Sequence, residues 1–141
     1  MTHPPRSLLL QSLTVAAIAN GTLLFFALGL FAPLSTVDPH FDRYGCLMIA
    51  LWGVAYFSSR RIALEAPALL TLFAIEKAAY VLRWCWWIQR EERSLAAIYE
   101  EAPLSGLFFS IYGAVDFCFM LCFAAIALRG WRLRRESAAA Q

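Results

Sequence analysis

The longest apolar run without a charge, residues 8–32, most constrains how this chain can fold. It has 25 residues, and at about 1.5 Å per residue such a helix exceeds the roughly 30 Å hydrocarbon core of a bilayer. The whole chain is 61% hydrophobic and 16% charged, whereas soluble domains are about half apolar and a quarter charged. One water-soluble core of this size could not bury so much apolar surface. We therefore expect an integral membrane protein.

A cleaved signal peptide is the alternative for this first run. Arg6 precedes the run, and Ala17-Ile18-Ala19 resembles a cleavage site. The apolar character continues for about another dozen residues beyond that site, which a cleaved peptide does not need. We therefore expect the run to be retained as a helix.

Four apolar runs are expected to cross the membrane as an all-α four-helix bundle, forming one transmembrane domain over residues 1–141. The runs are residues 8–32, 44–59, 67–89 and 104–128. The second run is short, and local thinning of the bilayer would accommodate it. Ser94 is a suitable N-cap, which predicts a short interfacial helix over residues 94–101.

The basic residues that flank the runs predict the orientation. The N-terminus, the connection between the second and third runs, and the C-terminus carry seven cations: Arg6, Arg60, Arg61, Arg129, Arg132, Arg134 and Arg135. The other two connections hold three arginines together with two aspartates and four glutamates. Because an excess of Lys and Arg marks the cytoplasmic side, we expect both termini in the cytoplasm and a multi-pass location in a bacterial inner membrane.

Polar residues inside the runs are expected to form an intramembrane cluster, because ionisable groups at that depth normally face protein or a water-filled cavity. Several lie near the middle of their runs, and those of the third run recur at i, i+4 and i+7 on one face. Gly113 is expected to leave room beside the acid of the fourth run. The expected members are Asn20, Glu76, Lys77, Tyr80, Arg83, Tyr112 and Asp116.

Two interpretations of this cluster compete. In the structural one, the charges of its four ionisable members sum to zero, and ion pairs hold the helices in register. In the functional one, the acids titrate or bind a polar head group, which the tyrosines and the asparagine orient. The zero sum favours the structural interpretation, since no acid is left over that would have to be protonated.

The four cysteines, Cys46, Cys85, Cys118 and Cys122, invite comparison with four-helix membrane thiol oxidoreductases. That chemistry needs a closely spaced, accessible pair, typically Cys-x-x-Cys. Cys118 and Cys122 are instead spaced i, i+4, while Cys46 and Cys85 are isolated but could approach each other. We expect all four to be small buried hydrophobic residues.

No motif in the chain indicates a catalytic, cofactor-binding or metal site. Asp38-x-His40-x-Asp42 could supply metal ligands, but no further ligands at an ordered spacing complete a coordination shell. A solvated turn that begins at Asp38-Pro39 is expected there. The formal net charge of +2 is too small to indicate a nucleic-acid partner.

Scattered residues resemble the small bacterial four-helix membrane proteins of the DoxX-like group. The resemblance implies a four-helix fold and a membrane location, and it transfers no catalytic residues. The residues that carry it are Asn20-Gly21, Pro33, the Gly45, Gly53 and Tyr56 spacing, Glu76-Lys77 and Asp116-Phe117.

For function we expect a non-enzymatic accessory or interaction protein whose neutral polar cluster sets helix register. Its partners would be the lipid bilayer and another membrane protein or a second copy. The alternative is a binding or transport module for a lipid, quinone or other amphipathic molecule, and a membrane thiol oxidoreductase is third. A ligand-sized pocket between the third and fourth runs, lined by Glu76, Lys77, Tyr80 and Asp116, would favour the binding module.

Overall fold

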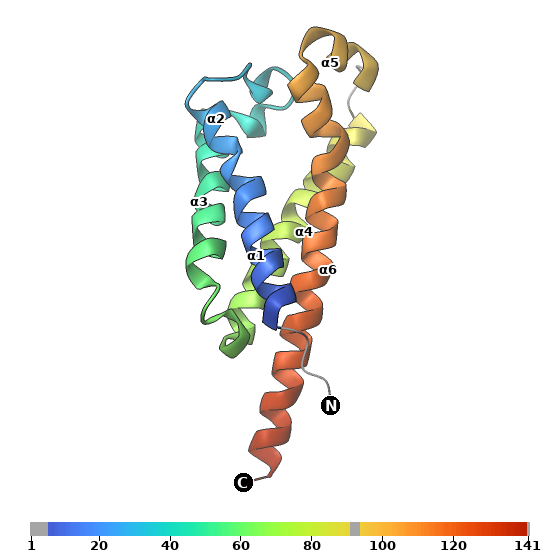
Figure 1. Cartoon of the computed structure of the whole chain (residues 1–141). Coiled ribbons are helices and arrows are strands. Elements are labelled where there is room, and N and C mark those ends of the chain that lie inside the picture. The colour runs from blue at the N-terminus through green and yellow to red at the C-terminus, as the bar shows by residue number, and fades with distance from the viewer. Residues whose placement is uncertain (1–5, 91–93, 141) are drawn as a thin grey trace.

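The computed structural model describes residues 6–90 and 94–140, and it consists of helices joined by short connections (Figure 1). No strand occurs within these residues, so the predicted all-α class is confirmed. The α-helices are α1 (Arg6–Gly21), α2 (Leu23–Ala27), α3 (Arg43–Ser59), α4 (Pro67–Arg90), α5 (Leu95–Glu101) and α6 (Pro103–Ala139). Short 3-10 turns lie at η1 (Leu34–Thr36), η2 (Pro39–Phe41) and η3 (Ala63–Glu65).

Two helical segments of the described chain are long and apolar enough to cross a membrane. They are Leu9–Ala27, which contains most of α1 and all of α2, and Pro103–Ala139, which is α6. Only 33% and 22% of their apolar windows are buried in the protein, whereas a core helix of a soluble protein is mostly buried. Length, composition and exposure are therefore consistent with a membrane protein.

The first helical segment ends earlier than the predicted span of residues 8–32. The Gly29 backbone has φ +74°, in the left-handed region. Its N–H donates to the Phe26 carbonyl, and the Leu30 N–H donates to the Phe25 carbonyl. This is the Schellman arrangement that ends helices at glycine, so the chain turns away after Ala27. At the other end of the chain, α6 continues past the predicted boundary at residue 128 to Ala139, because the arginines and alanines there favour helix.

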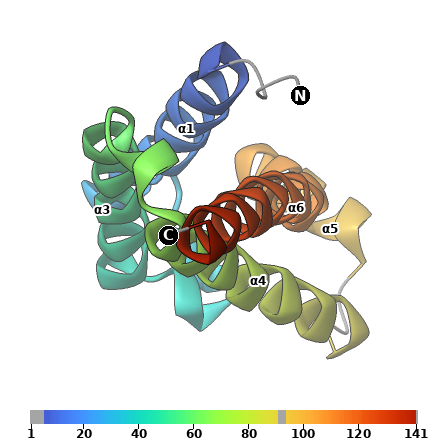
Figure 2. The ribbon, with the colours of Figure 1, turned by 90° about the horizontal axis from the view of Figure 1, so that it is seen from below.

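The helices are arranged as two antiparallel pairs. The α1 and α2 segment packs along α3, and α4 packs along α6, with α5 against the beginning of α6. Figure 2 shows α1 and α3 on one side of the molecule and α4 and α6 on the other. Packing between the pairs is sparser than packing within them, which leaves room for cavities at the junction. The α1 helix begins, and α6 ends, at the lower end of the molecule in Figure 1.

Buried apolar side chains form two clusters. The first includes Leu9, Leu13, Tyr56, Leu70, Phe73, Phe123 and Ala127. The second includes Leu23, Phe41, Trp87, Ile98, Phe109 and Tyr112. Along α1, α4 and α6, the polar residues Asn20, Glu76, Lys77 and Asp116 fall between members of the two clusters. A polar layer therefore separates two apolar layers.

Gly113 of α6 lies directly against the indole of Trp84 in α4. A Cβ atom at this position would lie 2.1 Å from Trp84 Cδ2, and the indole Nε1 donates to the Phe109 carbonyl at 2.8 Å. The prediction that Gly113 leaves room beside Asp116 is therefore wrong. The glycine makes room for a tryptophan that holds α4 and α6 close together.

Replacing Gly113 with alanine is expected to lower the free energy of unfolding by about 1–3 kcal/mol, because overpacking would force the fixed indole to move. Gly21→Ala is the matched control, since a Cβ atom at Gly21 meets nothing within 4 Å. That control is expected to leave stability unchanged or slightly raised. Thermal unfolding in detergent micelles measures both variants, and an equal effect of the two substitutions would contradict the packing described here.

Candidate functional site

Lys77 lies at the centre of a buried polar cluster. Its Nζ lies 2.9 Å from Asp116 Oδ1, donates to Asn20 Oδ1 at 2.9 Å, and lies 3.7 Å from Glu76 Oε2. The Lys77 side chain is 1% exposed and that of Glu76 is 6% exposed. One ammonium group is thus shared by two carboxyl groups and an amide from α1, α4 and α6.

Tyr56 of α3 completes this cluster and was not among the expected members. Its hydroxyl donates to Glu76 Oε2, and its ring packs edge-on against Phe73 with the centroids 4.7 Å apart. A tyrosine hydroxyl in the middle of an apolar helix usually finds a partner when it is buried. That rule is the signal in the sequence that could have identified Tyr56.

Arg83 lies outside the cluster, and its expected membership is wrong. Its Nε donates to Asp38 Oδ2 at 3.0 Å, and its terminal nitrogen lies 2.5 Å from Asp38 Oδ1. Arg83 is six positions beyond Lys77 in α4, which is about 9 Å along a helix. The guanidinium therefore reaches the connection that follows α2 rather than the cluster.

Asp38 is buried at the start of η2, which corrects the expectation of a solvated turn there. Its side chain is fully buried, and Oδ1 also accepts the His40 backbone N–H at 3.0 Å. The bidentate ion pair with Arg83 fastens this connection to α4. Carboxylate–guanidinium pairs of this geometry are stronger than ordinary hydrogen bonds and fix orientation as well.

The pairing of Arg83 changes the charge of the cluster. The expected neutrality counted Arg83 against the two acids, but Arg83 is already engaged by Asp38. Glu76 and Asp116 are left with Lys77 as their shared cation. The cluster therefore contains one carboxyl group more than its cation can balance.

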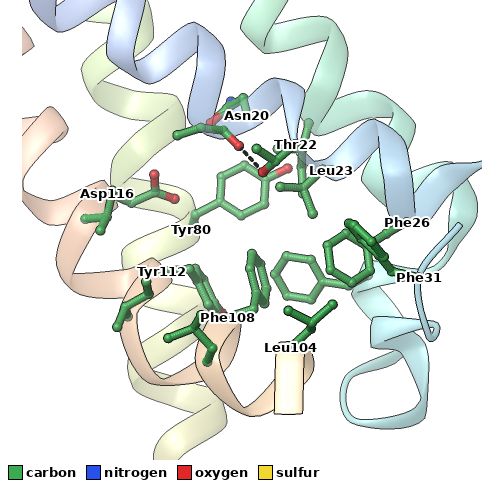
Figure 3. Close-up of a pocket in the computed structure, with 16 residues that line it drawn as sticks. Asn20, Thr22, Leu23, Phe26, Phe31, Tyr80, Leu104, Phe108, Tyr112 and Asp116 are labelled. Atoms are coloured by element: carbon green, nitrogen blue, oxygen red, sulfur yellow. Dashed lines mark hydrogen bonds between the residues drawn. The ribbon is translucent and has the colours of Figure 1, made fainter. Parts of the chain in front are cut away.

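A cavity of about 420 Å³ lies beside this cluster, and we call it the α1/α6 pocket. Figure 3 shows Asn20, Tyr80 and Asp116 at one end of it and Phe26 and Phe31 at the other. The full lining also includes Ala19, Thr22, Leu23, Phe41, Ile49, Leu104, Leu107, Phe108, Ile111, Tyr112 and Val115. The pocket is thus apolar along its length and polar at the end next to the cluster.

Two buried donors on the wall of the α1/α6 pocket lack partners. The Asn20 Nδ2 and the Tyr112 hydroxyl make no hydrogen bond to any described residue. The hydroxyl of Thr22, by contrast, donates to the Ala19 carbonyl at 2.7 Å, the dashed line in Figure 3. Buried polar groups in proteins are nearly always paired, so the two orphan donors are candidates to contact a ligand.

Aromatic rings form much of the remaining wall. Phe108 stacks on Tyr112 with the centroids 4.8 Å apart and the planes 13° from parallel. Phe26 and Phe31 meet edge to face at 5.2 Å, and Phe41 meets Phe108 in the same way at 5.1 Å. The pocket therefore offers flat apolar surfaces next to its hydrogen-bond donors.

A second cavity, of about 490 Å³, lies between α3 and α4, and we call it the α3/α4 pocket. Its lining comprises His40, Phe41, Trp52, Leu72, Ile75, Glu76, Ala79, Tyr80 and Arg83. Glu76 Oε1 is buried and has no hydrogen-bond partner in the described part of the chain. Tyr80 and Phe41 line both pockets.

The four residues expected to line one pocket are divided between these two cavities. Asp116 lines the α1/α6 pocket, Glu76 lines the α3/α4 pocket, and Tyr80 lines both. Lys77 lines neither pocket, because it is buried between the two acids. Neither cavity is therefore the expected pocket between α4 and α6, and the α1/α6 pocket is a different, ligand-sized cavity that contains two of the four residues.

The cysteines are dispersed and are all free thiols. Cys46 is buried, Cys122 is half-buried, and Cys85 and Cys118 are exposed. The expectation that all four are buried is thus wrong for Cys85 and Cys118, which lie on outward faces of α4 and α6. Among the residues described, no three His, Cys, Asp or Glu side chains are grouped to hold a metal ion.

Comparison of the chain with protein-family models, with curated proteins and with solved structures found no match. The resemblance to the DoxX-like group stays a prediction.

Proposed function

We propose that this protein is a four-span membrane protein that binds an amphipathic small molecule in the α1/α6 pocket. The observation that carries the proposal is the pair of buried, unpartnered donors, Asn20 Nδ2 and the Tyr112 hydroxyl, on the wall of an apolar cavity. From the sequence alone, a binding module is the alternative to an accessory protein. The α1/α6 pocket makes the binding module the function that we favour.

The chemistry of the pocket favours a ligand that carries carbonyl groups on a planar ring. Ligand sites are typically cavities of about 300–1,000 Å³, mostly apolar with a few placed polar groups. A buried donor without a partner costs about 1–3 kcal/mol, and a carbonyl oxygen would relieve that cost. The stacked and edge-on rings around Phe108 suit a flat apolar body. A quinone with an alkyl tail has these properties.

The proposed spans are the α1 and α2 segment, α3, α4 and α6. Many large apolar side chains on their outer faces are exposed, such as Leu24, Leu51, Leu82 and Leu121, and lipid would cover them. Arg60, Arg61 and the arginines of the α6 extension flank the end where α1 begins. Because Lys and Arg mark the cytoplasmic side, we propose that this end faces the cytoplasm, with both termini inside and the spans in a bacterial inner membrane.

Filling the pocket is expected to prevent ligand retention. Val115 lines the α1/α6 pocket, so Val115→Phe would occupy ligand volume. Native mass spectrometry of protein released from detergent micelles with a decyl-substituted benzoquinone counts the retained molecules. We expect one quinone per chain in the wild type and about tenfold weaker retention in Val115→Phe, which corresponds to ~1.4 kcal/mol. Tyr112→Phe, which removes one donor at nearly constant shape, should weaken retention by a similar factor.

Val54→Phe is the matched control, since Val54 is an exposed valine of α3 that lines neither pocket. It should retain quinone like the wild type. A diacylglycerol, whose ester carbonyls are also acceptors, is the second probe. Retention of diacylglycerol alone would assign the pocket to a lipid and reject the quinone. Equal retention of both probes by all four proteins would reject the pocket as the site.

A further inference from the structure

We propose that Glu76 holds an exchangeable proton, and that Lys77 couples this proton to the α1/α6 pocket. The proton site stands on the contacts of the cluster alone, whereas the coupling rests on the proposed function. The sequence offers titrating acids only as the less favoured interpretation of the cluster, because it counts Arg83 as the cation that balances the second acid.

The charges around Glu76 do not balance. The titratable groups that face it are Tyr56 from α3, Lys77 and Tyr80 from α4, and Asp116 from α6. The α1 helix contributes the uncharged Asn20. Arg83 and His40 line the same pocket as Glu76, but Arg83 is paired with the carboxylate of Asp38. Two buried acids thus share one cation, and an unpaired buried carboxylate is costly. A proton on one acid removes that cost.

The contacts of Lys77 indicate which of the two acids carries the proton. Lys77 Nζ is 2.9 Å from Asp116 and 3.7 Å from Glu76, so Asp116 is the ionised partner. Glu76 Oε2 accepts the Tyr56 hydroxyl, while Oε1 has no partner among the described residues. The proton is therefore assigned to Glu76 Oε1.

The α3/α4 pocket gives access to Glu76. Glu76 forms part of the wall of this cavity of about 490 Å³, which shares Tyr80 and Phe41 with the α1/α6 pocket. Because Oε1 itself is buried, exchange needs a small movement of the Glu76 side chain that exposes the carboxyl group to water entering this cavity. That water would accept the proton when the carboxyl group ionises and return it when the group is neutralised. Only the O–H bond breaks and re-forms in this exchange, and no electrons are transferred.

Lys77 links the two pockets because its ammonium group can form a close ion pair with only one of the two carboxylates at a time. When Glu76 ionises, it competes with Asp116 for the ammonium group, which already lies 3.7 Å from Glu76 Oε2. Movement of Lys77 toward Glu76 frees Asp116 and Asn20 Oδ1, which both belong to residues on the wall of the α1/α6 pocket. The proton at Glu76 therefore changes the polar end of the ligand site, and by linkage the ligand changes proton affinity.

Infrared spectroscopy of the purified protein tests the proton site without any ligand. At neutral pH the wild type should show the carbonyl band of a protonated carboxylic acid, and Glu76→Gln should lack it. Asp116→Asn should also lose the band, because Lys77 would then be free to neutralise an ionised Glu76. Glu65→Gln is the control, since Glu65 is exposed outside the cluster, and it should keep the band.

Absence of the band in the wild type would overturn the proton site, and so would its survival in Glu76→Gln. Survival in Asp116→Asn would overturn the sharing of Lys77. Coupling is measured by benzoquinone retention against pH, which should vary in the wild type and be constant in Glu76→Gln. A pH-independent wild type would overturn the coupling while leaving the infrared result intact. Failure of Val115→Phe to weaken retention would reject the ligand site alone, so the two proposals fail separately.

Discussion

Replacing Lys77 with methionine is expected to lower the free energy of unfolding by about 3–5 kcal/mol, because it leaves the buried carboxylate of Asp116 without a cation. Lys77 is 1% exposed and contacts Asp116, Asn20 and Glu76. Methionine keeps much of the length and apolar body of the lysine, so the loss measures charge and hydrogen bonding rather than volume. Chemical unfolding in detergent micelles, followed by circular dichroism, gives the free energy.

The double variant Lys77→Met with Asp116→Asn separates the loss of charge from the loss of packing. If Glu76 is protonated, this double variant contains no unbalanced carboxylate and should regain most of the lost stability. Arg61→Met, which removes an exposed cation, should change stability by no more than about 0.5 kcal/mol. A double variant no more stable than Lys77→Met would contradict the assigned pairing.

Replacing Arg83 with methionine is expected to cost about 3–5 kcal/mol as well, because the fully buried carboxylate of Asp38 would lose its cation. The effect should be local at first, since Asp38 lies in the connection between α2 and α3. Limited proteolysis should therefore cut within residues 28–42 in Arg83→Met and spare the wild type. Chemical unfolding in detergent micelles measures the decrease in the free energy of unfolding of the whole protein.

Asp38→Asn in the same chain should restore much of this stability, since an amide tolerates the absence of a cation. The interaction energy from the double-mutant cycle is expected to be about 3 kcal/mol, at the upper end of the range for residues in contact. Single variants whose effects simply add would show that the bidentate contact contributes nothing. Protection of residues 28–42 in Arg83→Met would reject its role in fastening the connection.

Features with a strong local cause could be predicted from the sequence. The all-helical class follows from the long apolar runs, and Ser94 caps α5 by accepting the Ala97 backbone N–H at 3.2 Å. Asn20, Glu76, Lys77 and Asp116 could be grouped because a buried charge must find partners at its own depth. These inferences need only helix geometry and the cost of burying charge.

Features that depend on the packing of distant segments could not be predicted in this way. Arg83 was assigned to the cluster by helical spacing, but Asp38 reaches it from a connection 45 positions away. The two cavities arise because the helices pack in pairs, and the order of helices along the chain does not determine how tightly the pairs meet. Gly29, with its positive φ, ends the first helical segment. The sequence did not predict this end, because the residues after Gly29 are also hydrophobic and extend the apolar run.

Benzoquinone retention by Val115→Phe beside Val54→Phe distinguishes a ligand in the α1/α6 pocket from one bound elsewhere. The two substitutions add the same side chain, one on the wall of the α1/α6 pocket and one at a position of α3 that lines neither pocket. We expect about tenfold weaker retention in Val115→Phe and wild-type retention in Val54→Phe. Equal retention by the two variants would contradict binding in the α1/α6 pocket.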